Sequence, residues 1–197
     1  MATIRPATSS DIGRIARTAS RAFADDPVMR WLVPDDQDYE TNHQAMFGNI
    51  ARRWLATDSL WCTDDVAAIA GWVPPGRPEV EPEDLVELQH PDWRLARFAA
   101  LREFMGANTP PEPHRYLNMQ ATHPDWQRQG LGAALMRQGF RVADEVGVPC
   151  YLETETVENV AYYRHHGFEV RSEWDVRTDD SDGPHMWGML RPAGLNV

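Results

Sequence analysis

The amino-acid sequence predicts a single α/β domain. Short apolar stretches typical of strands alternate with stretches in which apolar residues recur every three or four positions, as in amphipathic helices. The alternation is most regular in the second half of the chain, which predicts an α/β arrangement closed by a hairpin. The elements expected there are a strand at 115–122, a helix at about 130–146, a strand at 150–156, a helix at about 158–166 and hairpin strands at 168–176 and 184–191.

The first half begins with a short strand, TIRP (3–6), and a capping-box spacing at Thr8–Asp11. A helix follows from Ile12, and we expect it to end near Asp25-Asp26-Pro27, because proline disfavours helix at the preceding residue. The remaining elements of this half are a helix at about 38–56 and two strands, 59–63 and 66–73, around an Asp64-Asp65 turn.

The segment from about 74 to 113 differs in character from its surroundings. It has proline clusters at both ends, an acidic start and a helical pattern of apolar residues between Trp93 and Met105. Such a segment is too small to bury a core of its own. We therefore expect one domain over 1–197, with 74–113 as a helical insertion that covers part of it.

Composition narrows the class of partner. The net charge of −11 argues against nucleic acid, which needs a basic surface, and weakly favours a cationic or neutral substrate. All 19 basic residues are arginine, so the chain has no lysine. Cys62 and Cys150 fit no disulfide or zinc pattern, and MATIRPATSS has no apolar segment of the kind that signal peptides carry. We expect a cytoplasmic protein that neither enters a membrane nor binds a metal, as a monomer or homodimer.

The stretch HPDWQRQGLG (123–132) lies between the expected strand at 115–122 and the expected helix at 130–146. Glycines at a helix N-terminus let an anion approach backbone N–H groups and the positive end of the helix dipole. A Walker loop requires lysine, which is absent. A Rossmann fingerprint fails because Leu135 stands at its last position and seven residues separate the strand from Gly130.

Two motifs together resemble the GNAT family of N-acetyltransferases. Gln127–Gly132 matches its pyrophosphate loop, Gln/Arg-x-x-Gly-x-Gly/Ala, and Asn159–Phe168 matches its following helix, in which Tyr163 stands four residues before Gly167. The resemblance implies a mixed, splayed central sheet and acetyl-CoA as co-substrate. It places the coenzyme against Gln120, Ala121, Thr122, Gln127, Arg128, Gln129, Gly130, Leu131, Gly132, Ala133, Asn159 and Tyr162. The first three are expected to act through main-chain groups that an interrupted strand ladder frees.

Three shorter stretches resemble the puromycin-acetylating members of that family: AFADDP (22–27), LET (152–154) and GPHMWGM (183–189). This likeness implies a small, antibiotic-like or metabolite amine as acceptor. The chain departs from those enzymes at Asp26, where they have tyrosine, and at Arg128-Gln129, where they have Gly-Lys.

Acetyl transfer to an amine requires a base, and in CYLETET (150–156) strand alternation puts Tyr151, Glu153 and Glu155 on one face. Glu153 is the candidate general base, because a partly buried carboxylate has a raised pKa; a solvated strand face is the alternative. The resemblance makes Tyr163 the general acid for the CoA sulfur. A core aromatic is the alternative for Tyr163, and Tyr162 competes for both of its roles. Asn159 serves equally well as a pantetheine contact or as a polar residue at a helix start.

The acceptor wall is expected between the first two helices, where carboxylates beside aromatic rings would suit an ammonium group attached to a ring. Solvated turn residues and core aromatics explain the same residues as well. The candidates are Asp25, Asp26, Trp31, Tyr39 and His43. Two other functions stay open: acetylation of a protein N-terminus or lysine, and a non-catalytic acyl-CoA-binding sensor, which would need neither Glu153 nor Tyr163.

Overall fold

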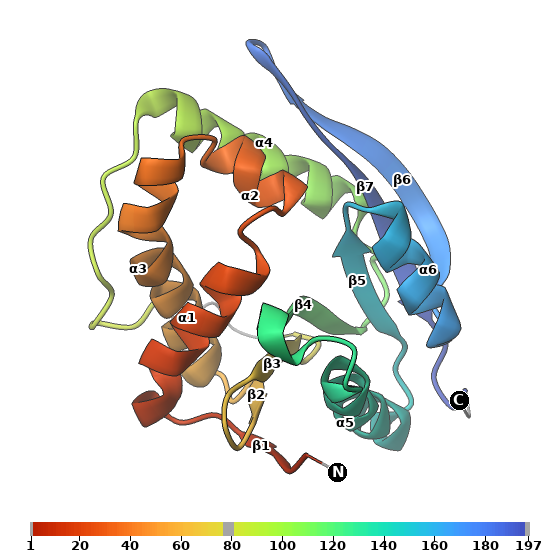
Figure 1. The fold of residues 1–197 in the computed structure, drawn as a ribbon. Coiled ribbons are helices and arrows are strands. Elements are labelled where there is room, and N and C mark those ends of the chain that lie inside the picture. The colour runs from red at the N-terminus through yellow and green to blue at the C-terminus, as the bar shows by residue number, and fades with distance from the viewer. Residues whose placement is uncertain (1, 77–80, 196–197) are drawn as a thin grey trace.

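The computed structural model describes residues 2–76 and 81–195. Within them, seven strands form one open sheet with helices on both faces (Figure 1). The strands are β1 (Ile4–Pro6), β2 (Leu60–Thr63), β3 (Ala68–Val73), β4 (Arg115–Thr122), β5 (Cys150–Thr154), β6 (Glu169–Thr178) and β7 (Ser181–Arg191). The helices are α1 (Ile12–Ala22), α2 (Pro27–Leu32), α3 (Asp36–Leu55), α4 (Asp92–Asn108), α5 (Leu131–Val146) and α6 (Val157–His165), with short 3₁₀ turns η1 (Ser9–Asp11) and η2 (Pro124–Trp126).

The strand order is β1-β2-β3-β4-β5-β7-β6, and every neighbouring pair is antiparallel except β4 and β5. This parallel pair joins the two halves of the sheet, but only through Arg115 with Cys150 and Tyr116 with Tyr151. Beyond these residues the strands separate. The structure confirms the predicted α/β class with a mixed, open sheet flanked by helices.

Side chains on opposite faces of the sheet build two cores. Ala68, Ala70 and Trp72 of β3 pack against α5, which contributes Leu135 and Phe140 to this cluster. On the opposite face, the second cluster joins the sheet to α1 and α3 and contains Ile15, Phe47, Trp54, Leu60 and Ile69. Alternation along the strands therefore gives each helical layer its own apolar surface.

The region 74–113 contains α4, which packs across the upper part of β6 and β7 together with α2 (Figure 1). Residues 77–80 of this predicted insertion lie outside the described residues. Two ion pairs fasten its acidic segment to α3, Arg53 with Glu81 at 2.8 Å and Arg52 with Asp84 at 2.9 Å. Two hydrogen bonds between the Asn49 side chain and the backbone of Val86 add to them.

Several predicted boundaries shift. The first helix ends at Ala22, and Pro27 begins a separate helix, α2, because proline at a first helical position lacks only an N–H that would go unbonded anyway. β5 ends at Thr154, since Thr156 caps α6. The residues between the predicted hairpin strands 168–176 and 184–191 are mostly strand: Thr178 pairs with Ser181, leaving a turn of two residues. Among the described residues, no helix is both long and apolar enough to cross a membrane.

Candidate active site

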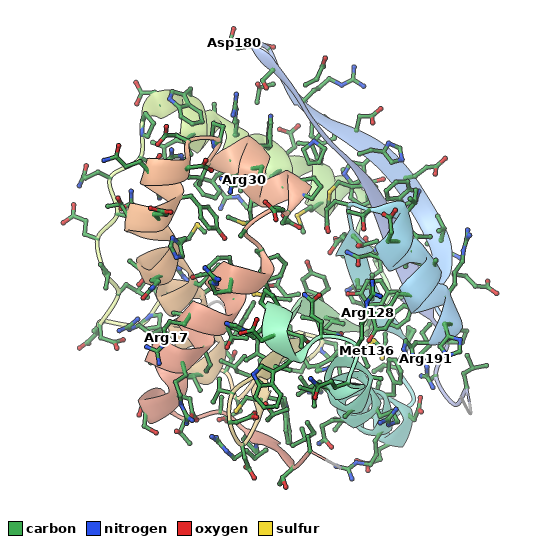
Figure 2. All side chains as sticks on the ribbon, in the orientation of Figure 1. Arg17, Arg30, Arg128, Met136, Asp180 and Arg191 are labelled. Atoms are coloured by element: carbon green, nitrogen blue, oxygen red, sulfur yellow. The ribbon has the colours of Figure 1, made fainter. Side chains whose placement is uncertain are left out.

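The loop before α5 presents backbone N–H groups to solvent. Gly130 has φ +78° as the N-cap of α5, and Arg128 has φ +60°, a conformation that costs a non-glycine residue energy. Residues 127–130 are exposed, and Figure 2 shows Arg128 beside the start of α5. Alternating backbone conformations of this kind form an anion-binding nest. In the first turn of α5, the N–H groups of Leu131, Gly132 and Ala133 have no intrahelical acceptor.

The edge of β4 that faces β5 is open beyond Tyr116. This opening replaces the interrupted ladder expected at Gln120, Ala121 and Thr122. Those three residues pair in regular register with β3, whereas the register shift lies earlier, where Gly71 faces Met119 and the next residue, Trp72, faces Leu117. The free main-chain groups of β4 therefore arise because the two halves of the sheet diverge, and the residue omitted from pairing is Asn118.

Gln120 contributes its side chain as well as its main chain. A Cβ atom on Gly132 would stand 2.4 Å from Nε2 of Gln120 and 3.0 Å from the Tyr162 hydroxyl. Oε1 of Gln120 is buried and has no hydrogen-bond partner among the described residues. The glycine at 132 thus leaves a narrow cradle in which an unpaired polar atom lies beside the anion-binding loop. These features fit a CoA pyrophosphate and pantetheine arm.

The two tyrosines of α6 point to different places. The Tyr162 hydroxyl lies beside Gly132 and interacts with Gln120, next to the loop. Tyr163 packs against the core and against Phe168, and burial raises its pKa, as does the nearby charge of Glu155. Tyr163 is therefore a protonated hydroxyl close to the acidic end of β5, whereas the Tyr162 hydroxyl lies beside the start of α5.

Asn159 holds a carboxylate. Its backbone N–H donates to the Thr156 hydroxyl at 3.2 Å, and its Nδ2 donates to Oε1 of Glu155 at 3.2 Å. The helix start and the acidic end of β5 are thereby tied together. The sequence left open whether Asn159 is a pantetheine contact or a polar residue at a helix start, and the structure places it in the first turn of α6.

A cavity of about 690 Å³ opens on the side of β4 and β5 away from α5. Its walls are mainly apolar and come from α2, α3, α4 and β7. Of the acidic side chains that line it, Asp26, Glu153 and Glu155 lie around the end of β5, near Tyr116 and Asn118, whereas Glu81 and Glu87 belong to the covering segment 81–90. Because β4 omits Asn118 from pairing, both Asn118 and Met119 line this cavity. Polar groups that converge in an apolar cavity are typical of a small-molecule site.

Glu153 lies in this cavity, and its Oε2 atom is buried without a hydrogen-bond partner among the described residues. Burial raises the pKa of Glu153 to about 7, although the neighbouring hydroxyl groups of Tyr116 and Tyr151 favour its charged form. A carboxyl group with this pKa exchanges a proton readily at neutral pH.

Glu155 and Asp26 form a second acidic group in the same cavity. Asp26 caps α2, accepting a hydrogen bond from the Met29 backbone N–H at 2.8 Å. Burial raises the pKa of both carboxyl groups, and the interaction with Asp26 contributes to a pKa of about 8 for Glu155. The pair therefore holds a shared proton near neutral pH.

Of the five predicted acceptor-wall residues, only Asp26 lines the cavity. Asp25 is exposed outside it. Trp31 packs against the β6–β7 hairpin and donates to the Ser181 hydroxyl at 3.0 Å. Tyr39 is buried and donates to the Ser20 carbonyl at 2.8 Å, and His43 stacks on the Tyr39 ring. The helical positions of Trp31 and Tyr39 direct them into contacts with other elements, whereas His43 contacts Tyr39 within α3.

Sequence reasoning missed Tyr116, Asn118, Met119 and Met186 as parts of the cavity. Tyr116 was recognisable in principle, because it begins the strand at 115–122. Asn118 and Met119 line the cavity because Asn118 is left out of pairing with β3, and Met186 lines it because of the position of the β6–β7 hairpin. Among the described residues, no three histidine, cysteine or acidic side chains gather in a way that could hold a metal ion.

A splayed sheet with an anion-binding loop on one side and an acidic cavity on the other is the architecture of a transferase for two substrates. The model of the Acetyltransferase (GNAT) family matches residues 26–168. The chain belongs to this family and is an acetyltransferase. The family uses acetyl-CoA as its acetyl donor.

Solved structures share the fold. A histone acetyltransferase HPA2 and related acetyltransferase from Corynebacterium glutamicum matches with a TM-score of 0.71 at 23% identity, over 100% of this chain and 99% of that one. Arylalkylamine N-acetyltransferase 2 from Aedes aegypti matches with a TM-score of 0.69 at 12% identity, over 96% of this chain and 98% of that one. PaiA N-acetyltransferase from Thermoplasma acidophilum, in complex with coenzyme A, matches with a TM-score of 0.56 at 11% identity, over 98% of this chain and 99% of that one. At these identities the similarity extends to the fold alone.

Proposed function

We propose that this acetyltransferase transfers an acetyl group from acetyl-CoA to the amine of a small molecule, by direct attack while both substrates are bound. The observation that carries the proposal is the position of Glu153. Its unpaired carboxyl oxygen lies in an apolar cavity beside the point where β4 and β5 separate. Donor and acceptor can meet there from opposite sides of the sheet.

On the coenzyme side, the exposed loop Gln127–Gly130 and the first turn of α5 would hold the pyrophosphate through main-chain N–H groups. The open edge of β4 at Gln120–Thr122 would bind the pantetheine amides. Acetyl-CoA supplies a thioester, whose carbonyl oxygen can accept a hydrogen bond from the same edge.

On the acceptor side, Glu153 would remove the proton that the amine loses on attack. Its pKa of about 7 leaves roughly half of the groups ionised at neutral pH and still basic enough to accept a proton. Tyr163 would donate a proton to the departing sulfur, since its raised pKa keeps its hydroxyl protonated. General acid–base groups of this kind contribute about 10² to 10⁴ in rate.

The cover of the cavity favours a small acceptor over a protein. α4 and the segment at 81–90 line the cavity, and the bonds of Arg52 and Arg53 hold that segment to α3. An extended peptide would need an open groove across this face. Resemblance to puromycin N-acetyltransferase at 22–27, 152–154 and 183–189 also supports a small-molecule acceptor.

Thiol release from acetyl-CoA tests the proposal. Puromycin and tryptamine serve as acceptors, and a reaction without amine serves as the blank. Release above the blank with either amine supports a small-molecule N-acetyltransferase. If only peptide N-termini or lysine peptides give release, the acceptor is a protein. If acetyl-CoA binds but no amine in any class gives release, the chain is a sensor.

A further inference from the structure

The part of the cavity next to β5 contains two separate acidic positions. Glu153, in β5, and Glu155, just after the end of that strand, both line the cavity and are two residues apart. Two residues of extended chain span about 6.6 Å. Glu153 has Tyr116 and Tyr151 as neighbours, whereas Glu155 has Asp26 and Asn159. An amine at the first position therefore leaves the second position free for another group.

Within residues 2–76 and 81–195, the Asp26–Glu155 pair has no cationic partner of its own. The Met29 backbone N–H and the Asn159 side-chain amide, which donate hydrogen bonds to it, are both neutral. Among the described residues, the groups that shift the pKa of either carboxyl include no arginine or histidine. Arg53, on the cavity lining, is already paired with Glu81. Two buried acids without a counter-cation are unfavourable unless they share a proton or a cation binds between them.

The rest of the cavity wall suits a hydrocarbon. Met29, Leu32, Phe98, Leu101 and Met105 line it. A ligand that reaches from Glu153 to Glu155 along this wall needs an apolar spacer with a basic group at each end.

We propose that the acceptor is a dication, with one amine placed at Glu153 for acetylation and a second basic nitrogen bound between Asp26 and Glu155. This inference rests on the proposed function, because it takes the Glu153 position as the place where acetylation occurs. The separation of about 6.6 Å corresponds to an extended spacer of about four or five carbon atoms between the nitrogens. The second ammonium replaces the shared proton of the pair, so the two carboxylates and the cation form a charge-assisted cluster.

A matched pair of acceptors tests the proposal. The diamine 1,5-diaminopentane and the monoamine pentylamine have the same carbon chain and differ only in the second nitrogen. For the wild-type enzyme we expect kcat/KM to be at least about tenfold higher for the diamine. Glu155→Gln should remove most of this preference. The control is Glu158→Gln, which changes an exposed carboxylate of α6 three residues away and should keep the preference.

Calorimetric titration of the CoA-saturated protein with the same two amines separates binding from catalysis. Diamine binding that weakens at least tenfold in Glu155→Gln supports the binding of a second cation at Asp26 and Glu155. If neither amine is acetylated in that case, the proposed function fails while this cation site stands. Equal or better use of pentylamine by the wild type overturns the inference and leaves acetyl transfer standing. Failure of the wild type to bind the diamine also overturns it.

Discussion

The side-chain amide of Gln120 occupies the space that a side chain at position 132 would need: a Cβ atom on Gly132 would stand 2.4 Å from its Nε2. The Tyr162 hydroxyl lies 3.0 Å from the same point. Strand β4, helix α6 and the start of α5 therefore meet at one glycine beside the anion-binding loop. This junction lies between the loop, recognisable in the sequence, and the open edge of β4, which together form the proposed coenzyme groove.

Gly132→Ala should raise KM for acetyl-CoA by at least about tenfold, because the new methyl group pushes the Gln120 amide toward the groove. The matched control is Gly106→Ala in α4, where a Cβ atom would meet nothing within 4 Å. The double variant Gly132→Ala/Gln120→Ala should recover much of the affinity. Steady-state kinetics with varied acetyl-CoA measure all three; an unchanged KM in Gly132→Ala would contradict the assignment of this groove.

Tyr163→Phe and Tyr162→Phe should behave differently. Loss of the Tyr163 hydroxyl should lower kcat by about 10² with little change in KM, since it removes a proton donor. Loss of the Tyr162 hydroxyl should mainly raise KM for acetyl-CoA, because this group lies beside Gly132 and Gln120. If the Tyr162 variant alone loses kcat, the roles of the two residues are reversed.

The stability of the Glu153→Gln variant should depend on pH in a defined direction. Glu153 has a raised pKa of about 7 in the folded protein, against 4.5 for an ordinary glutamate. Between these values the unfolded chain binds fewer protons, so ionisation destabilises the folded wild type as pH rises. The variant lacks this penalty. Its free energy of unfolding relative to wild type should therefore increase by about 2 kcal/mol from pH 5 to pH 8. Urea denaturation of both proteins at pH 5 and pH 8 measures this change. If the difference in the free energy of unfolding between variant and wild type is the same at both pH values, the carboxyl group is not buried.

Asp11→Asn should lower the free energy of unfolding at pH 7 by about 2 kcal/mol. Asp11 is buried and bonds to Arg5 at 2.8 Å and to Arg14 at 2.7 Å, which joins β1 to the start of α1. These bonds hold the pKa of Asp11 well below its usual value. The contribution is present above pH 3.8 and is lost at more acidic pH. Asp64→Asn is the control, because this exposed carboxylate also pairs with Arg5, at 3.2 Å, and should matter little.

The sequence predicted the order of the main elements because each has strong local signals. The strand at 115–122 has the same bounds in the structure, and Gly130 and Gly147 flank α5 in left-handed conformations. Helix α2 was missed because six residues are too few for a helical period to show. Its N-cap, Asp26, was recognisable only as a residue before proline.

The candidate site was also partly predictable, because some of its residues carry local sequence signals. Glu153 and Glu155 share a face in the structure as strand alternation predicts, and both line the cavity. Trp31 and His43 were assigned to the acceptor wall from their position between the first two expected helices and from their residue types, and neither carries information about which way a helix faces. Asn118 and Met119 both line the cavity because β4 omits a residue from pairing, which reverses the alternation and leaves no local signal.

The role of Glu153 is tested most directly by the pH dependence of acceptor-dependent thiol release, measured for wild type and Glu153→Gln with acetyl-CoA binding followed in parallel. Wild-type kcat/KM should rise with pH to about 7 and then level, as the pKa of Glu153 requires. The variant should bind acetyl-CoA normally and be slower by at least about 10², without that rise. A Glu153→Gln variant that keeps the wild-type rate and pH profile would contradict the assignment of the catalytic base.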